Sequence, residues 1–180
     1  AVVSLRAKIL HAVPDSKLLL KNNGIDVEPN RSRILSMFSE AGIPPSRLIL
    51  EGKSTREEHL ACYQRIDIAL SPFPYNGGTT SVEGLWMGVP VITLRGDHFV
   101  SHVSESIVHN AGLAEWVAAD EDEYIAKALA FASDLNALAI LRKGLREKVL
   151  RQPLFDAERF ACHFEEAMFA MRKTLAKSER

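Results

Sequence analysis

Residues 71–93, SPFPYNGGTTSVEGLWMGVPVIT, contain a loop, a helix start and a strand in close succession. The apolar run that leads into them, IDIALS at 66–71, is typical of a buried strand. Two prolines and two adjacent glycines end that strand, and two threonines open a helix. The next strand is GVPVITL at 88–94. A strand–helix–strand unit with short connections predicts two parallel strands in one sheet.

The alternation of strands and helices continues on both sides of this unit. Upstream, the expected elements are helices at 2–12 and 31–41, strands at 16–21 and 47–52, and a short helix opened by a capping box of Thr55 and Glu58. Downstream, they are a helix at 98–110, a strand at 114–118, helices at 120–133 and 135–151, and a last helix capped by Asp156. The pattern predicts an α/β fold with a doubly wound parallel sheet. Ligands of such sheets bind beyond the carboxyl ends of the strands.

The composition is that of a globular chain with one substantial core. The 180 residues are 47% hydrophobic and 25% charged, and the formal net charge is −1. This balance gives no general reason to expect nucleic acid or an anionic membrane as a partner, so an anion site has to be built locally. No apolar run approaches the roughly 18 residues that a membrane span needs, and from the first ten residues we expect no signal peptide.

The two cysteines indicate the redox state of the protein's surroundings, and the first residues indicate whether the chain is part of a longer protein. Cys62 and Cys162 match no metal-site spacing, and we expect two reduced thiols in a cytoplasmic protein rather than a disulfide. The first residue is not Met, and a helical apolar pattern begins at once. We therefore expect residues 1–180 to form a single domain cut from a longer protein.

The loop Gly77-Gly78-Thr79-Thr80 is the first candidate site. A helix start presents unpaired amide N–H groups and about half a positive charge, and glycines let an anion approach without a Cβ in the way. With the two hydroxyls, these groups form a possible pyrophosphate cradle. The alternative is an ordinary turn in which a threonine caps the helix. The sequence has neither a P-loop nor a GxGxxG fingerprint.

Glu83 favours the nucleotide interpretation. It lies one turn beyond Thr80 on the same helical face, where a carboxylate could accept hydrogen bonds from a ribose diol. Its ordinary role would be that of a first-turn acid favoured by the helix dipole, worth well under about 1 kcal/mol. A nucleoside diphosphate accounts for the glycines, the threonines and the carboxylate together.

Two segments carry a resemblance to a known family. DIALSPFPYNGGTTSVEGLWMGVPVITLRGD at 67–97 and LRKGLREKVLRQPLFDAERFACHFEEAM at 141–168 resemble the C-terminal catalytic lobe of the O-linked N-acetylglucosamine transferase and SPINDLY family. The likeness extends from about residue 8 to 173. These are glycosyltransferases of the GT-B fold, with two Rossmann-like lobes and the active site between them. The resemblance implies that this chain is the C-terminal half of such a fold.

The resemblance also implies roles for individual residues. The amides from Gly78 to Thr80 and the hydroxyls of Thr79 and Thr80 would hold the diphosphate and stabilise the charge that builds on it as it leaves. Glu83 would bind the ribose. No metal or other cofactor is implied. No residue of this chain is assigned as a general base, and the acceptor cleft would belong partly to the missing N-terminal lobe.

The segment STREEH at 54–59 would flank the base in this resemblance. Ser54 would contact the base through its backbone, Arg56 stands where the family has a base-contacting Lys, and His59 falls on a His beside the nucleotide. The sequence departs from the animal transferases at three positions: Gly78 replaces a His, Glu83 an Asp and Arg56 a Lys. FPYNGGTT and Glu83 are closer to the SPINDLY-like branch, whose plant members use GDP-fucose.

The leading interpretation is the donor-binding lobe of a protein O-glycosyltransferase that moves N-acetylglucosamine from UDP-GlcNAc to Ser or Thr hydroxyls. The protein acceptor would be bound through the missing N-terminal regions, and tetratricopeptide repeats there would favour it. The fragment alone is expected to bind nucleotide weakly and to be inactive. The alternatives are a GDP-fucose-using SPINDLY-like transferase, another GT-B enzyme such as a nucleotide-sugar epimerase or a glycolipid transferase, and a degenerate interaction module.

Three further features have simpler interpretations. His98 and His102 have the spacing of a metal-binding pair, but we expect a solvated helix face, with His98 as an alternative diphosphate contact. The apolar stripe Phe160, Phe164, Met168, Met171 and Leu175 predicts core packing, with partial exposure as the alternative if it faces a missing lobe. The basic cluster at 141–151 predicts the solvated side of an amphipathic helix.

Overall fold

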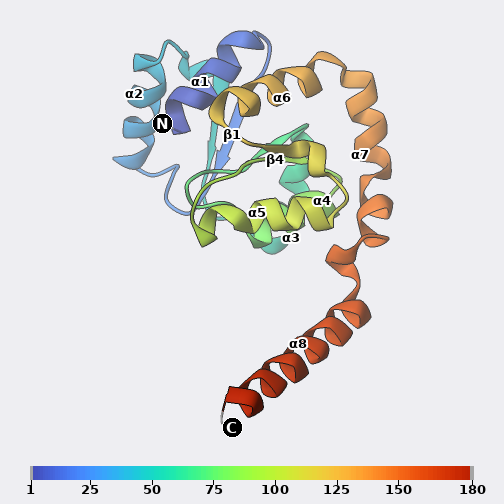
Figure 1. Cartoon of the computed structure of the whole chain (residues 1–180). Coiled ribbons are helices and arrows are strands. Elements are labelled where there is room, and N and C mark those ends of the chain that lie inside the picture. Colours follow the sequence, from blue (N-terminus) through green and yellow to red (C-terminus); the bar gives the residue numbers. More distant parts are fainter. Residues whose placement is uncertain (1, 179–180) are drawn as a thin grey trace.

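The computed structural model describes residues 2–178 and shows alternating helices and strands along the chain (Figure 1). The helices are α1 Val2–Ala12, α2 Asn30–Glu40, α3 Arg56–Cys62, α4 Thr79–Trp86, α5 Phe99–Asn110, α6 Glu121–Ser133, α7 Leu135–Leu150 and α8 Ala157–Ser178. The strands are β1 Leu18–Lys21, β2 Leu48–Glu51, β3 Ala69–Leu70, β4 Val91–Leu94 and β5 Val117–Ala118. Each predicted helix and strand is therefore present.

All strand pairs are parallel, as the alternation predicts. β1 pairs with β2, and β3, β4 and β5 lie side by side in that order. The hydrogen bonds thus form two separate sheets, of two and three strands, rather than one continuous sheet. The predicted third strand at 66–71 is reduced to Ala69 and Leu70, because only these two residues pair with β4 and the chain bends at residues 67 and 68.

The main core surrounds β4, all four residues of which are buried. Helices α1 and α6 lie on one side of the strands, and α3, α4 and α5 lie on the other (Figure 1). Trp116 is almost fully buried and stacks on Phe131 with ring centroids 3.7 Å apart. A smaller core, with Phe38 and Ile43 at its centre, joins α1, α2 and the β1–β2 pair. Phe73, in the loop between β3 and α4, packs against the larger core.

The helix ends follow the sequence signals closely. Thr55 and Glu58 form the predicted capping box at the start of α3. Asp120 accepts a hydrogen bond from the amide of Glu123 at 2.8 Å and caps α6. Gly112 has a φ of +70° just after α5, a conformation that a side chain would strain.

Helix α8 contradicts the prediction of core packing. The chain turns at Pro153–Phe155, and α8 then extends away from the other elements (Figure 1). The five apolar residues of the predicted stripe are all exposed, by 51% to 69%. Helical spacing brought these residues to one face, but no other element of residues 2–178 covers that face. The alternative of an exposed stripe is the correct one for these residues.

Helix α7 is less solvated on its basic side than predicted. Leu138, Leu145 and Val149 are buried against the core. Arg142 donates hydrogen bonds to the carbonyl oxygens of Gly88 and Tyr63, at 3.3 and 3.4 Å, and pairs with Asp67. Arg146 lies over the ring of Trp86, 4.1 Å from its centroid. Two of the predicted surface cations therefore hold α7 against the rest of the fold.

No single helix within residues 2–178 combines the length and the apolar character that crossing a membrane requires. Only α6 and α7 taken together pass by length and composition, and they are bent by 94° at their junction.

Candidate nucleotide-binding site

The candidate site begins where the loop after β3 becomes α4. Gly78 is the N-cap residue of α4, and its carbonyl accepts hydrogen bonds from the amides of Ser81 and Val82, at 3.0 and 3.3 Å. Within residues 2–178, the amides of Gly78, Thr79 and Thr80 donate no hydrogen bond to another protein group. Both threonine side chains are exposed. Free amides and hydroxyls at a helix start are the groups that bind phosphate.

Glu83 lies one turn into α4 and contacts two residues of α3. One carboxylate oxygen pairs with Nη1 of Arg56, and the other lies 3.2 Å from Nε2 of His59. The Glu83 side chain is only 10% exposed, whereas that of Arg56 is 67% exposed. Glu83 thus meets two predicted site residues that lie more than twenty positions before it in the sequence.

Tyr63 links this cluster to the start of α4. Its hydroxyl donates a hydrogen bond to the carbonyl oxygen of Thr80 at 3.1 Å, and its ring meets that of His59 edge-on. Burial, followed by the charge of Glu83, raises the pKa of Tyr63 to about 12. The phenol therefore stays protonated at neutral pH and keeps this bond. The sequence analysis did not identify Tyr63, since a buried aromatic residue has no signal of its own.

The two glycines of the loop differ in their surroundings. A Cβ on Gly77 would lie 2.7 Å from Oγ of Ser81 and 2.8 Å from Oγ1 of Thr80, so a side chain there would displace these hydroxyls. A Cβ on Gly78 would meet only Val103, at 3.8 Å. Packing of these hydroxyls therefore favours glycine at position 77, which the sequence analysis did not single out. The role of Gly78 beside an anion stays a prediction.

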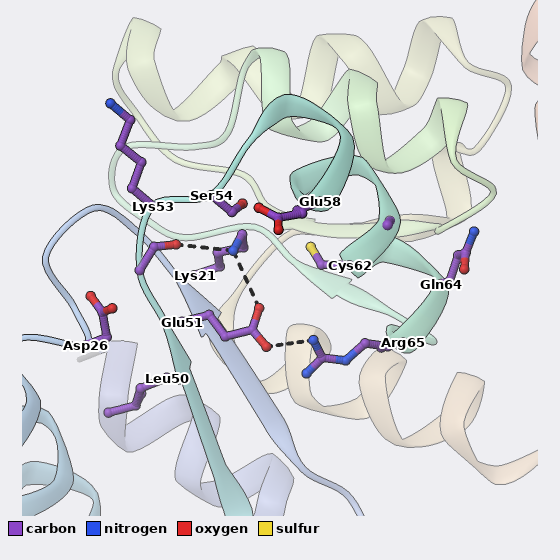
Figure 2. A pocket seen from close by; sticks show the side chains of 12 residues that line it. Lys21, Asp26, Leu50, Glu51, Lys53, Ser54, Glu58, Cys62, Gln64 and Arg65 are labelled. Carbon is purple, nitrogen blue, oxygen red and sulfur yellow. Dashed lines mark hydrogen bonds and ion pairs between the residues drawn. The ribbon is translucent and has the colours of Figure 1, made fainter.

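Ser54 lies apart from the other predicted site residues. It lines a cavity of about 680 Å³ beside β1, β2 and the far face of α3, together with Glu58 and Cys62 (Figure 2). Gly78, Thr79, Thr80, Arg56, His59 and Glu83 do not line this cavity. The structure therefore brings Arg56, His59 and Glu83 together at α4 and leaves Ser54 on the other side of α3.

Side chains of both positive and negative charge line the cavity. Lys21 lies near its centre and donates to the carbonyl oxygen of Gly52 at 3.2 Å (Figure 2). Glu51 pairs with Lys21 and with Arg65, at 3.5 and 2.6 Å. The hydrogen bond from Arg65 lowers the pKa of Glu51, and burial raises the pKa of Cys62. The charged groups thus already compensate one another.

The histidine pair at the start of α5, His98 and His102, is exposed on the surface. His102 is paired with Glu105 at 2.7 Å, and Glu105 also binds Arg95. The amide of His98 donates to the hydroxyl of Ser101, which closes the first turn of α5. In the part of the chain that the structure describes, no group of three His, Cys, Asp or Glu residues could hold a metal ion. Both cysteines are free thiols, as predicted.

Comparison with known proteins identifies relatives of this chain. The family model described as glycosyl transferase family 41 matches residues 1–164. A barley protein named "Probable UDP-N-acetylglucosamine--peptide N-acetylglucosaminyltransferase SPINDLY" is 39% identical over 94% of this chain. The UDP-N-acetylglucosamine–peptide N-acetylglucosaminyltransferase of Caenorhabditis elegans is 30% identical over 92% of the chain.

A solved structure agrees with these sequence matches. A mutant O-GlcNAc transferase of Thermobaculum terrenum superposes on 99% of this chain with a TM-score of 0.91 and 37% identity. The chain covers 34% of that protein, 18% of the barley relative and 14% of the C. elegans relative. The resemblance and the fold predicted from the sequence are both confirmed, and the chain spans about a fifth of the length of its curated plant relatives.

Proposed function

Because the chain belongs to glycosyl transferase family 41, we propose that it is the donor-binding lobe of a protein O-glycosyltransferase. In this proposal, UDP-GlcNAc gives its sugar to the Ser or Thr hydroxyl of a protein acceptor. The names of the plant and nematode relatives support this donor and this class of acceptor. The remaining parts of the enzyme would supply the acceptor cleft.

The observation that carries the proposal is the cluster at α4. Unpaired amides of Gly78, Thr79 and Thr80 lie one helical turn from the buried carboxylate of Glu83. The first group suits an anion, and the second suits a donor of hydrogen bonds. A nucleoside diphosphate offers both features, because its phosphates are followed by a ribose diol.

The chemistry needed from this lobe is stabilisation of a leaving group. When the acceptor oxygen attacks the anomeric carbon, negative charge builds on the departing diphosphate. Fixed N–H and O–H donors directed at that charge lower the barrier, because they need no rearrangement during the reaction. The amides of Gly78 to Thr80 and the hydroxyls of Thr79 and Thr80 would be these donors.

The nucleoside would lie between the start of α4 and α3. Glu83 would accept hydrogen bonds from the ribose, and the exposed Arg56 and the partly buried His59 would flank the base. Ser54 would contact the base only through its backbone, because its side chain lines the cavity on the other face of α3. No residue of this group would act as a general base in the proposal.

Titration calorimetry with UDP and with GDP tests the proposal. We expect UDP to bind, and the double variant Thr79→Ala with Thr80→Ala to bind it at least about tenfold more weakly, because two hydrogen bonds to a charged group are lost. Thr174→Ala, on the exposed face of α8, is the matched control and should bind like the wild type.

The outcomes separate the alternatives. Tighter binding of GDP than of UDP would support a GDP-sugar donor, such as GDP-fucose. If the folded protein binds neither nucleotide, or if the double variant binds as tightly as the wild type, the proposed site is wrong.

A further inference from the structure

The peptide of Gly77 is held by three buried serines that come from three different elements. Its N–H donates to Oγ of Ser71, at the end of β3, at 3.2 Å. Its carbonyl accepts hydrogen bonds from Ser81 of α4, at 3.0 Å, and from Ser104 of α5, at 2.5 Å. The three serines are at most 5% exposed. Both the N–H and the carbonyl of Gly77 are therefore held by hydrogen bonds to buried side chains.

The hydroxyls form a complete hydrogen-bond network. Oγ of Ser104 lies 2.9 Å from that of Ser71 and 3.0 Å from that of Ser81. If Ser71 donates to Ser104, both Ser81 and Ser104 can donate to the Gly77 carbonyl, and every hydroxyl proton has an acceptor. Ser104 is the centre of this network, since it contacts both other serines and the loop.

The neighbouring residue is anchored to α5 and β4. The side-chain amide of Asn76 donates to Oγ1 of Thr93 at 3.0 Å and to the carbonyl oxygens of Leu94 and Ser101, at 3.2 and 2.6 Å. Asn76 is 1% exposed. The backbone of Asn76 and Gly77 is therefore held in one conformation. This conformation determines the direction of the N–H groups of the next three residues.

We propose that Ser104 is a positioning residue for diphosphate binding, although it touches no ligand itself. Its hydroxyl orients the Gly77 peptide and thereby directs the free amides of Gly78, Thr79 and Thr80 at the phosphates. Preorganised donors of this kind lose binding strength when their support is removed. The inference rests on the proposed function and assigns to α5 a part in it.

The test compares Ser104→Ala with Ser106→Ala, an exposed position of the same helix. Affinities for UDP and UMP are measured by calorimetry, or for GDP and GMP if GDP binds the wild type more tightly. We expect Ser104→Ala to weaken UDP about three- to tenfold, the range that one internal hydrogen bond supports. UMP should change less, so that the ratio of the two affinities falls. Ser106→Ala should leave both unchanged.

Two results would overturn the inference while leaving the proposed function intact. In one, Ser104→Ala binds UDP like the wild type. In the other, UDP and UMP weaken by the same factor, which is the effect of a general loss of fold. If Ser104→Ala does not fold, Ser81→Ala removes the other donor to the same carbonyl, and the same fall in the ratio is expected. If the wild type binds neither diphosphate, the proposed function fails first.

Discussion

Helices α7 and α8 follow one another in the chain, and both repeat apolar residues at helical spacing, yet their surroundings are opposite. Helix α7 buries Leu138, Leu145 and Val149 against the core. Helix α8 leaves Phe160 and Phe164 exposed, stacked only on each other. The difference shows that periodicity fixes which face of a helix is apolar, whereas burial depends on whether another element lies opposite it.

The largest expected effect is on the free energy of unfolding, which should respond to a substitution in α7 but not to one in α8. Leu145→Ala should lower the free energy of unfolding by about 2–5 kcal/mol, because a fully buried side chain leaves a cavity. Phe164→Ala, in α8, should change it by no more than about 0.5 kcal/mol, since the ring is exposed. Urea denaturation measures both. Equal losses would mean that α8 packs against the core in solution and would break the comparison.

A smaller effect is expected at the polar contacts of α7. Arg142→Met should destabilise the fold by about 1–3 kcal/mol, because the carbonyl oxygens of Gly88 and Tyr63 lose their donor. Arg172→Met makes the same change on the exposed surface of α8 and serves as the control. If both variants unfold at the same urea concentration, Arg142 contributes nothing beyond a solvated charge.

The smallest effect concerns reactivity rather than stability. Cys162 is exposed on α8, whereas Cys62 is buried and its pKa is raised by that burial. A raised pKa leaves less thiolate at a given pH, so Cys62 should react with a disulfide reagent only as the pH rises further or the protein unfolds. Absorbance of the released thiol should show one fast thiol at pH 7.5. Two fast thiols would mean that Cys62, at the end of α3, is accessible to the reagent in the folded protein.

Much of the fold could be predicted because its signals are local. Thr55 with Glu58, Asp120 and Gly112 each mark a helix end within a few residues, and the structure places them there. The exposure of α8 could not be predicted, because burial depends on whether another element lies opposite the helix. The third strand was overestimated, because the apolar pattern at 66–71 does not reveal the bend at residues 67 and 68, and only Ala69 and Leu70 pair with β4.

The candidate site divides in the same way. Glu83 and His59 could be proposed from the motif and the resemblance, and the structure brings them together. Tyr63 and Ser104 could not be found, because their roles depend on contacts between distant elements. Gly77 was proposed as a glycine that lets an anion approach, whereas in the structure the hydroxyls of Ser81 and Thr80 lie where its Cβ would be.

The pairing of Glu83 with Arg56 and His59 has a consequence for any ligand that takes its oxygen atoms. Such a ligand must replace the guanidinium of Arg56 and the imidazole of His59, which already pair with the carboxylate of Glu83. Its affinity is then a difference between two sets of contacts, and the unoccupied protein avoids the penalty of a buried, uncompensated charge.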